Sequence, residues 1–506
     1  MSPQTTLIVL ILYFGVLFFI SWRTSRGATT ETFFTANRNA PWYLVAFGMI
    51  GASLSGVTFI SVPGQVGASA FSYMQIVFGY LLGYLVIATV LLPLYYKHNL
   101  TSIYEYLNIR FGFWSYKTGA SFFILSRVIG SAFRLFLAAG VLQIFLFEPL
   151  GIPFEIAVFV TIVLVLLYTF QGGIKTIVWT DTLQTLFMLL AVGITIVMIG
   201  KELGLNSISE IYSSVSDNAM SKIFFWDINT PKNFYKQFLG GAFIAITMTG
   251  LDQDMMQKDL SCKTLGESQK NIFWFSIVLV FVNLLFLAMG ALLYIYANTK
   301  GITIPERTDM LYPIIAKNHL PALAGILFLI GIIAAAYSSA DSALTALTTS
   351  FCVDFLGFND KDSSNSISTD KNIEAKIIDL PKKETIDETD KKSLRLQVQV
   401  GFAAVLFFVI LAFHYYNDRS VIDGIFTAAG YTYGPLLGLY AFGMFTKIEI
   451  KDNFTPFICV VAPIVTFFLV SFINNSPELF GGYKIGYEAI LINGGLTFLG
   501  LLLAKK

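Results

Sequence analysis

Long apolar runs, separated by short polar loops, recur along the whole of this 506-residue chain. Each run holds about twenty residues, the length at which an α-helix crosses about 30 Å of hydrocarbon. The pattern therefore predicts an all-α polytopic membrane protein. The thirteen predicted spans are 5–22, 42–60, 72–96, 118–147, 153–170, 176–200, 236–252, 272–298, 322–350, 396–416, 421–446, 454–473 and 484–504.

Composition supports this prediction and limits the classes of molecule that the protein is expected to bind. Hydrophobic residues make up 55% of the chain and charged residues only 13%, whereas a soluble domain has about 25% charged residues. The net charge of +1 indicates no nucleic-acid partner, so the expected partners are the lipid bilayer and a small solute. Three widely separated cysteines, Cys262, Cys352 and Cys459, indicate neither a metal cluster nor a disulfide framework.

Lysine and arginine in the short loops predict the orientation of the chain. Basic residues follow alternate spans, as Lys97, Lys258 and Lys447 do, and the chain ends in Lys505 and Lys506. Because such loops face the cytoplasm, we expect the N-terminus outside and the C-terminus inside. Residues 358–395 are polar, rich in both signs of charge and poor in aromatics, which is typical of a mobile cytoplasmic loop.

Span 2 contains helix-breaking residues in the middle of an apolar run. Its sequence, MIGASLSGVTFISVPGQVG, combines glycines and Pro63 with Ser53, Ser55 and Thr58. A helix interrupted at membrane depth is tolerated where the freed backbone lines a cavity. Close packing of helices through small residues is the alternative interpretation.

Span 9 carries an unusual number of oxygens for a membrane segment, in GIIAAAYSSADSALTALTTS (331–350). Ala335, Ser338, Ser339 and Ser342 share one helix face, and Asp341 lies at its edge. Serine hydroxyls can bond to carbonyls of their own helix. Several hydroxyls beside a carboxylate favour a site for a hard cation such as Na⁺ instead.

Two further spans place ionisable residues in the membrane. Asp181 lies one to two turns inside span 6, where a carboxylate is expensive and therefore a functional candidate, unless it reaches interfacial water. In span 4, Arg127 could snorkel to an interface. Arg134 is close to mid-span, so we expect a carboxylate or carbonyl partner for it, supplied by the protein or by a substrate.

With these residues in view, the chain resembles the sodium:solute symporter family. The pieces that carry the resemblance follow one another in order: NLTSIYEYLNIRFG (99–112), YTFQGGIKTIVWTDTLQ (168–184), GLDQDMMQKDLSCKT (250–264), AAAYSSADSAL (334–344) and GYTYGPLLGLYAFGMF (430–445). The resemblance implies a LeuT-like fold with two inverted five-helix repeats, about 42–200 and 236–446, and extra terminal helices in a single domain, 1–506. It also implies Na⁺-coupled import of a small solute by an integral membrane protein, which we expect in a bacterial inner membrane.

The resemblance further implies the site residues. The family's main sodium site corresponds here to Gly51, Leu54, Ala335, Ser338 and Ser339. A second site, found in some members, corresponds to Asp181 and Ser342, with Asp341 at a position where the family often has a hydroxyl. The substrate pocket corresponds to Ser53, Ser55, Thr58, Gln75 and Arg134.

The resemblance leaves the substrate and the ion stoichiometry open. Arg134 matches an arginine that binds the carboxylate in members that carry sialic acid, which favours a sialic acid, another sugar acid or a monocarboxylate. A neutral sugar or an amino acid is the alternative, and so is proton coupling through Asp181 or Asp341. One or two Na⁺ ions are expected. The sequence has no catalytic triad, zinc-protease motif or phosphate-binding loop, so no enzyme activity is expected.

Overall fold

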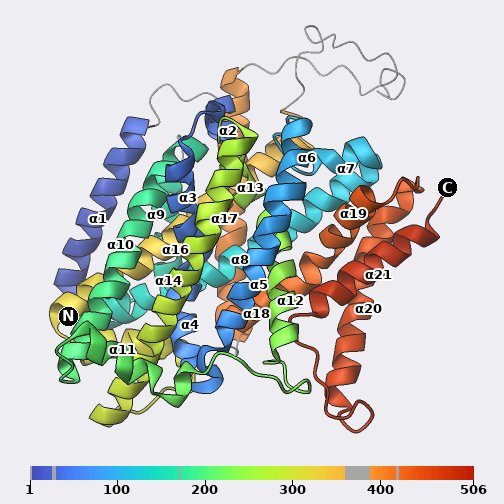
Figure 1. Ribbon diagram of the computed structural model, residues 1–506. Helices are drawn as coiled ribbons and strands as arrows, with labels where there is room; N and C mark the ends of the chain where they lie inside the picture. The colour runs from blue at the N-terminus through green and yellow to red at the C-terminus, as the bar shows by residue number, and fades with distance from the viewer. Residues whose placement is uncertain (1–2, 25–29, 170–172, 359–387, 417–420) are drawn as a thin grey trace.

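The computed structural model is built of helices that run roughly side by side through one bundle (Figure 1). It describes residues 3–24, 30–169, 173–358, 388–416 and 421–506. Eight helical runs in this part of the chain are long and apolar enough to cross a membrane, and shorter apolar helices accompany them. The chain is therefore an integral membrane protein, as its hydropathy pattern predicts.

Most helices of the first half of the chain overlap the predicted spans. The helices of this half are α1 (Pro3–Thr24), α2 (Thr30–Thr35), α3 (Trp42–Leu54), α4 (Gly56–Ser69), α5 (Tyr73–Val86), α6 (Leu92–Lys97), α7 (Glu105–Arg110), α8 (Phe113–Leu142), α9 (Phe154–Thr169), α10 (Gly173–Glu202) and α11 (Ile208–Ser216). The short helices α2, α7 and α11 lie between the predicted spans. A π-helical turn, Ile87–Leu91, connects α5 to α6.

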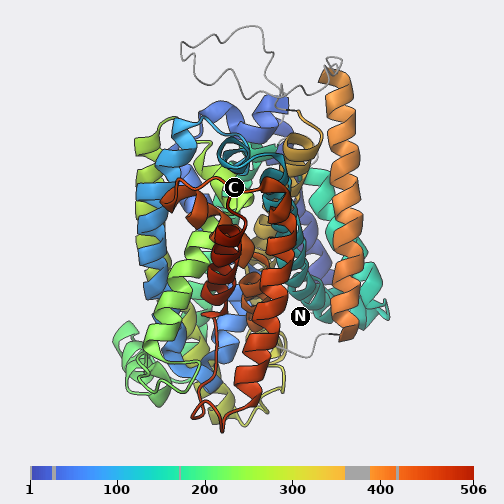
Figure 2. The ribbon, with the colours of Figure 1, turned by 90° about the vertical axis from the view of Figure 1, so that its right-hand side faces the viewer.

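The second half continues the same architecture. Its helices are α12 (Phe234–Ala245), α13 (Gln253–Asp259), α14 (Leu265–Lys300), α15 (Leu311–Asn318), α16 (Ala322–Ser350), α17 (Glu388–Tyr416), α18 (Val421–Thr432), α19 (Gly434–Phe445), α20 (Thr455–Asn475) and α21 (Ala489–Leu503). Figure 2, turned by 90°, shows α17 and α20 standing along the outside of the bundle.

The prediction of a loop over residues 358–395 is wrong at the C-terminal end of that stretch. Helix α17 begins at Glu388, so the last eight residues of that stretch are helical. They continue directly into the apolar run after Arg395. Because each residue added to an existing helix gains one backbone hydrogen bond, the helix of the apolar run extends backward into these polar residues. Residues 359–387 lie outside the described part of the chain.

Two predicted spans are broken in the structure, and a third ends at a break. Span 2 divides into α3 and α4, and span 11 divides into α18 and α19. Span 7 comprises α12 and a π-helical turn, Ile246–Gly250, and the separate helix α13 follows it at Gln253. Figure 1 shows α3, α13 and α19 in the upper half of the bundle and α4, α12 and α18 in the lower half. The breaks therefore meet near the middle of the bundle, where they position the candidate site.

Candidate ion and substrate site

The interruption of span 2 is confirmed and lies at a single residue. Helix α3 ends at Leu54 and α4 begins at Gly56, with Ser55 at a φ of +22° between them. Gly56 allows a close approach to α16, because a Cβ there would lie 3.2 Å from the Cβ of Ala336. The break therefore lies directly against the hydroxyl-rich helix, α16.

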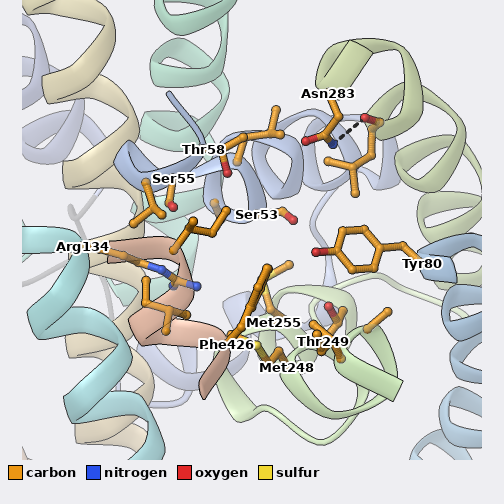
Figure 3. Close-up of a pocket in the computed structure, with 18 of the residues that line it drawn as sticks. Ser53, Ser55, Thr58, Tyr80, Arg134, Met248, Thr249, Met255, Asn283 and Phe426 are labelled. Atoms are coloured by element: carbon orange, nitrogen blue, oxygen red, sulfur yellow. Dashed lines mark hydrogen bonds between the residues drawn. The ribbon is translucent and has the colours of Figure 1, made fainter. Parts of the chain in front are cut away.

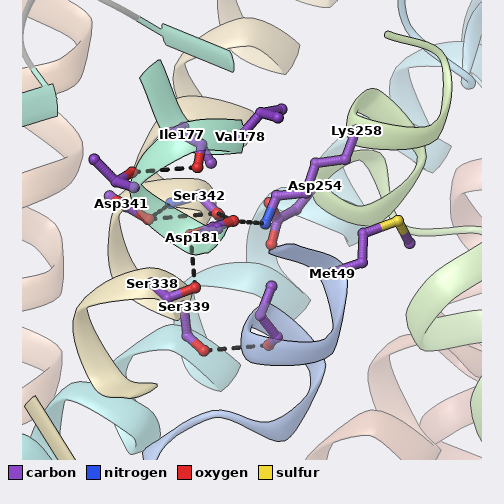
Figure 4. Close-up of polar contacts among 12 residues, drawn as sticks. Met49, Ile177, Val178, Asp181, Asp254, Lys258, Ser338, Ser339, Asp341 and Ser342 are labelled. Carbon is purple, nitrogen blue, oxygen red and sulfur yellow. Dashed lines mark hydrogen bonds and ion pairs between the residues drawn. The ribbon is translucent and has the colours of Figure 1, made fainter. Parts of the chain in front are cut away.

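The hydroxyl of Ser339 connects α16 to this broken segment. Its Oγ lies 3.2 Å from the carbonyl oxygen of Ala52 and 3.3 Å from that of Ala335 (Figure 4). Three oxygens thus lie together between α3 and α16, and carbonyl and hydroxyl oxygens are the type of ligand that a hard cation prefers. The nearby carbonyl of Gly51 accepts the N–H of Ser55 at 3.1 Å, which keeps the last turn of α3 helical.

Asp181 is the centre of a second polar group, and none of its surface is exposed. Ser338 donates a hydrogen bond of 2.6 Å to Oδ1, and Ser342 donates one of 3.5 Å to Oδ2. Ser338 therefore turns toward Asp181, away from Ala52. The interfacial alternative for Asp181 is wrong, because this carboxylate is enclosed between α10 and α16.

Asp341 lies beside this group and is also fully buried. Its Oδ1 accepts the N–H of Ser342 at 2.6 Å. Its Oδ2 accepts no hydrogen bond from the described residues. Two carboxylates and two hydroxyls thus lie close together, so the region carries excess negative charge unless a cation is near.

Lys258 supplies such a cation, and the sequence did not reveal it. We expected Lys258 in a cytoplasmic loop, and that prediction is wrong. The residue lies in α13, is 1% exposed, and its Nζ lies 2.7 Å from Oδ2 of Asp181 (Figure 4). The signal was present in QDMMQKDL, a polar segment that ends an apolar span, but such a segment resembles an ordinary loop.

Arg127 does not snorkel to an interface. It is buried, ion-paired with Asp254, and its guanidinium lies 3.6 Å from Oδ2 of Asp252. Tyr433 also donates a hydrogen bond to Asp252. This cluster ties α8, the start of α13 and the α18–α19 junction together. Neither aspartate was predicted as a site residue, although two carboxylates beside an apolar span are a recognisable signal.

A cavity of about 80 Å³ lies beside the α3–α4 break, and Arg127 is among the residues that line it. Four of the predicted substrate residues line it: Ser53, Ser55, Thr58 and Arg134 (Figure 3). Tyr80, Thr249 and Asn283 also line it and were not predicted. The hydroxyls of Ser53 and Ser55 therefore share one cavity with side chains from α5, α12, α14 and the π-helical turn that follows α12.

Arg134 differs from Arg127 in its partners. Its guanidinium points into the cavity in Figure 3. No carboxylate of the described chain lies within 4.0 Å of it, and its Nε has no hydrogen-bond partner there. A buried guanidinium is costly without a partner, so the cavity presents one unsatisfied positive charge.

Gln75 lies outside this cavity. Its amide donates to the carbonyl of Lys232 at 2.9 Å and to Oε1 of Gln237 at 2.7 Å. Its carbonyl accepts the N–H of Phe225 at 3.1 Å. These bonds fasten α5 to the segment before α12 and leave the side chain no free donor toward the cavity.

Comparison with known proteins places this architecture in a family. The model of the sodium:solute symporter family matches residues 33–448. The chain is 25% identical to the sodium/sialic acid symporter NanT of Aliivibrio fischeri, over 97% of this chain and 92% of that protein. It is 22% identical to the sodium/sialic acid symporter SiaT of Proteus mirabilis, over 94% of this chain and 90% of that one.

A solved structure shares the fold. The substrate-bound, outward-open structure of a Na⁺-coupled sialic acid symporter superposes with a TM-score of 0.78 at 20% identity, covering 99% of this chain and 98% of the other. The match of the family model and the shared fold agree with each other. This chain belongs to the sodium:solute symporter family.

Proposed function

We propose that this protein imports a carboxylated solute, a sialic acid or a similar sugar acid, together with Na⁺. The observation that carries the proposal is the contrast between the two buried arginines of α8. Arg127 is paired with Asp252 and Asp254, whereas Arg134 faces the cavity with no carboxylate of the described chain within 4.0 Å. A substrate carboxylate would be the matching bidentate partner.

Relatives support the same substrate class. NanT and SiaT are both named sodium/sialic acid symporters. The other groups that line the cavity, the hydroxyls of Ser53, Thr58, Tyr80 and Thr249 and the amide of Asn283, suit a polyhydroxylated solute. Oδ1 of Asn283 has no hydrogen-bond partner among the described residues and is available as an acceptor.

The coupling ion would bind where α3 meets α16. The proposed ligands of the first Na⁺ are Gly51, Leu54, Ala335, Ser338 and Ser339, and Ser338 would have to turn from Asp181 to reach the ion. The Ser339 hydroxyl meets the carbonyl oxygens of Ala335 and of Ala52, which lies between Gly51 and Leu54 in α3, and these contacts support the position. Residues 52–55 line the substrate cavity as well, so an ion that holds this segment would also shape the pocket.

A second Na⁺ would use Asp181, Ser342 and Asp341. In the present arrangement Lys258 occupies one side of Asp181. A second ion therefore requires Lys258 to withdraw or to share the carboxylate. The clustered carboxylates favour a second cation, and the resident ammonium favours a single Na⁺, so the stoichiometry is one or two.

Transport would follow alternating access. The cavity of about 80 Å³ is smaller than the roughly 300–1,000 Å³ of ligand pockets, so its walls have to move for a sugar acid to enter. The proposed framework is two inverted repeats, 42–200 and 236–446, with the N-terminus outside and the C-terminus inside a bacterial inner membrane. Each charge that enters down 100 mV contributes about 2.3 kcal/mol.

Uptake into proteoliposomes tests the proposal. Purified protein should accumulate radiolabelled N-acetylneuraminic acid under an inward Na⁺ gradient and not when choline replaces Na⁺ at constant pH. Uptake that persists in choline but follows a proton gradient would support proton coupling through Asp181 or Asp341 instead. Competition by unlabelled monocarboxylates, neutral sugars and amino acids distinguishes the remaining substrate classes.

A further inference from the structure

An apolar groove lies between the two C-terminal helices, away from the transport site. It encloses about 410 Å³ between α20 and α21. One face of α20, with Phe457 and Val461, and one face of α21, with Leu496 and Leu503, form its walls. Lys451 also lines it.

The groove opens toward the surroundings of the protein. Phe457 is 68% exposed and Leu503 is 90% exposed. Because α20 is long and apolar enough to cross the membrane, its exposed face meets lipid chains. An apolar groove on such a face suits an acyl chain, since lipid is the solvent there.

Backbone hydrogen bonds hold the lysine-bearing ends of the two helices together. The N–H of Lys451 donates to the carbonyl of Ala504 at 2.8 Å, and the N–H of Lys506 donates to the carbonyl of Glu449 at 3.0 Å. Ile450 and Lys505 form the antiparallel bridge between them. The pairing therefore brings Lys451, Lys505 and Lys506 to the mouth of the groove.

The carboxylates near this mouth are already occupied. Glu449 lies 3.4 Å from Nζ of Lys506. Asp452 accepts the N–H groups of Trp114 and Ser115 at 2.7 and 2.8 Å, which caps the start of α8. No carboxylate of the described chain lies within 4.0 Å of Lys451 or Lys505. The mouth thus carries positive charge that the protein does not neutralise.

From this combination we infer that the groove binds an anionic phospholipid. One acyl chain lies along the walls of α20 and α21, and the phosphate lies at Lys451 and Lys505. The apolar walls match the acyl chain of such a lipid, and the lysines match its anionic headgroup. The site is separate from the transport cavity, so the inference does not depend on the proposed substrate.

Native mass spectrometry of the full-length protein tests this site. The protein is released from nanodiscs that contain equal amounts of phosphatidylglycerol and phosphatidylcholine, and the retained lipids are counted. We expect one phosphatidylglycerol to be retained in preference to phosphatidylcholine. The double variant K451Q/K505Q should lose this preference by about fivefold for each lysine.

Two further variants separate the groove from general charge effects. K263Q/K270Q removes the same charge from exposed lysines around the start of α14 and should retain phosphatidylglycerol as the unchanged protein does. Val461→Trp fills the groove and should reduce retention of both lipids. Thermal unfolding and Na⁺-dependent uptake establish that each variant is folded.

Three results would overturn the inference. They are equal retention of the two lipids by the unchanged protein, an equal loss in K263Q/K270Q, and a dimer that Val461→Trp dissociates. The last result would mean that a second copy of the chain, and not a lipid, covers the groove.

Discussion

Lys258 and Asp181 form a buried ion pair, with Nζ 2.7 Å from Oδ2, across 77 residues of sequence. The pair joins α13, the short helix that follows span 7, to the N-terminal part of α10. The same carboxylate accepts the hydroxyl of Ser338 on α16. One side chain thus connects three helices from different parts of the chain, and the candidate ion ligands surround it.

Lys258→Met should destabilise the protein strongly. It leaves Asp181 uncompensated beside Asp341, and removal of one partner of a buried pair costs about 3–5 kcal/mol. The midpoint of thermal unfolding in detergent, measured without Na⁺, should fall. Added Na⁺ should then restore more stability in this variant than in the unchanged protein, because the ion can take the place of the ammonium.

Two comparison variants isolate the ion pair. Lys258→Met combined with Asp181→Asn should recover most of the lost stability, since both charges are gone. Lys236→Met removes a buried lysine whose carboxylate partner, Glu488, is 4.0 Å away, and should cost less. Equal losses in the Lys258 and Lys236 variants would argue against a special role for the pair.

Ser339→Ala should raise the Na⁺ concentration that gives half-maximal uptake by about 10-fold to 100-fold. The reason is the loss of a hydroxyl that meets the carbonyl oxygen of Ala52, since a bond to a charged group contributes about 1.5–3 kcal/mol. The dependence of uptake rate on Na⁺ concentration, at constant ionic strength, measures the effect.

The matched control for this prediction is on the same helix. The hydroxyl of Thr348 bonds only to the carbonyl of Leu344 in its own helix, at 2.7 Å. Thr348→Ala should leave the Na⁺ dependence unchanged. An unchanged Na⁺ requirement in Ser339→Ala would remove this residue from the first ion site.

Arg134→Ala should reduce uptake of N-acetylneuraminic acid by about 100-fold or more, because a bidentate pair with the substrate carboxylate is lost. Arg134→Lys should restore only part of the uptake, since an ammonium cannot form the same fork. Na⁺-induced thermal stabilisation should persist in both variants, which separates solute recognition from ion binding. Normal uptake by Arg134→Ala would contradict the proposed role.

Arg127→Ala should behave differently from the Arg134 variants. It leaves Asp252 and Asp254 buried and unpaired, so the main effect should be a lower unfolding temperature. If Arg127→Ala were as stable as the unchanged protein, the cluster around Asp252 would not hold α8 to α13.

Gly79→Ala should destabilise the packing of α5 against α12. A Cβ at Gly79 would lie 2.0 Å from the carbonyl oxygen of Phe238, so the two backbones would have to separate. Overpacking of this kind costs about 1–3 kcal/mol. Gly495→Ala, where nothing lies within 4 Å of the added Cβ, should leave the unfolding temperature unchanged or slightly higher.

The sequence predicted the broken span 2 and the group on α16, because both leave local signals. Pro63 and the glycines of span 2 disfavour a continuous helix, and the structure has the break at Ser55, directly before Gly56, while Pro63 lies inside α4. The spacing of Ser338 and Ser342 indicates one helix face. Both hydroxyls contact Asp181.

The partners of the buried charges were predicted less well. Lys258 resembled a loop residue because it follows an apolar run, and Arg127 resembled a snorkelling residue. Their carboxylate partners are on other helices. Gln75 was expected in the pocket, but its amide bonds the segment before α12, a contact that no local pattern encodes.

The sequence by itself determined the membrane class, the positions of the long helices and the break in span 2. These follow from the length of apolar runs and the backbone preferences of glycine, proline and serine, which act over a few residues. The tertiary structure alone decided that Lys258 neutralises Asp181, that Arg127 is paired and that Arg134 faces a cavity. Burial makes such pairing obligatory, yet each partner comes from a distant segment. Only the packing of helices selects among them.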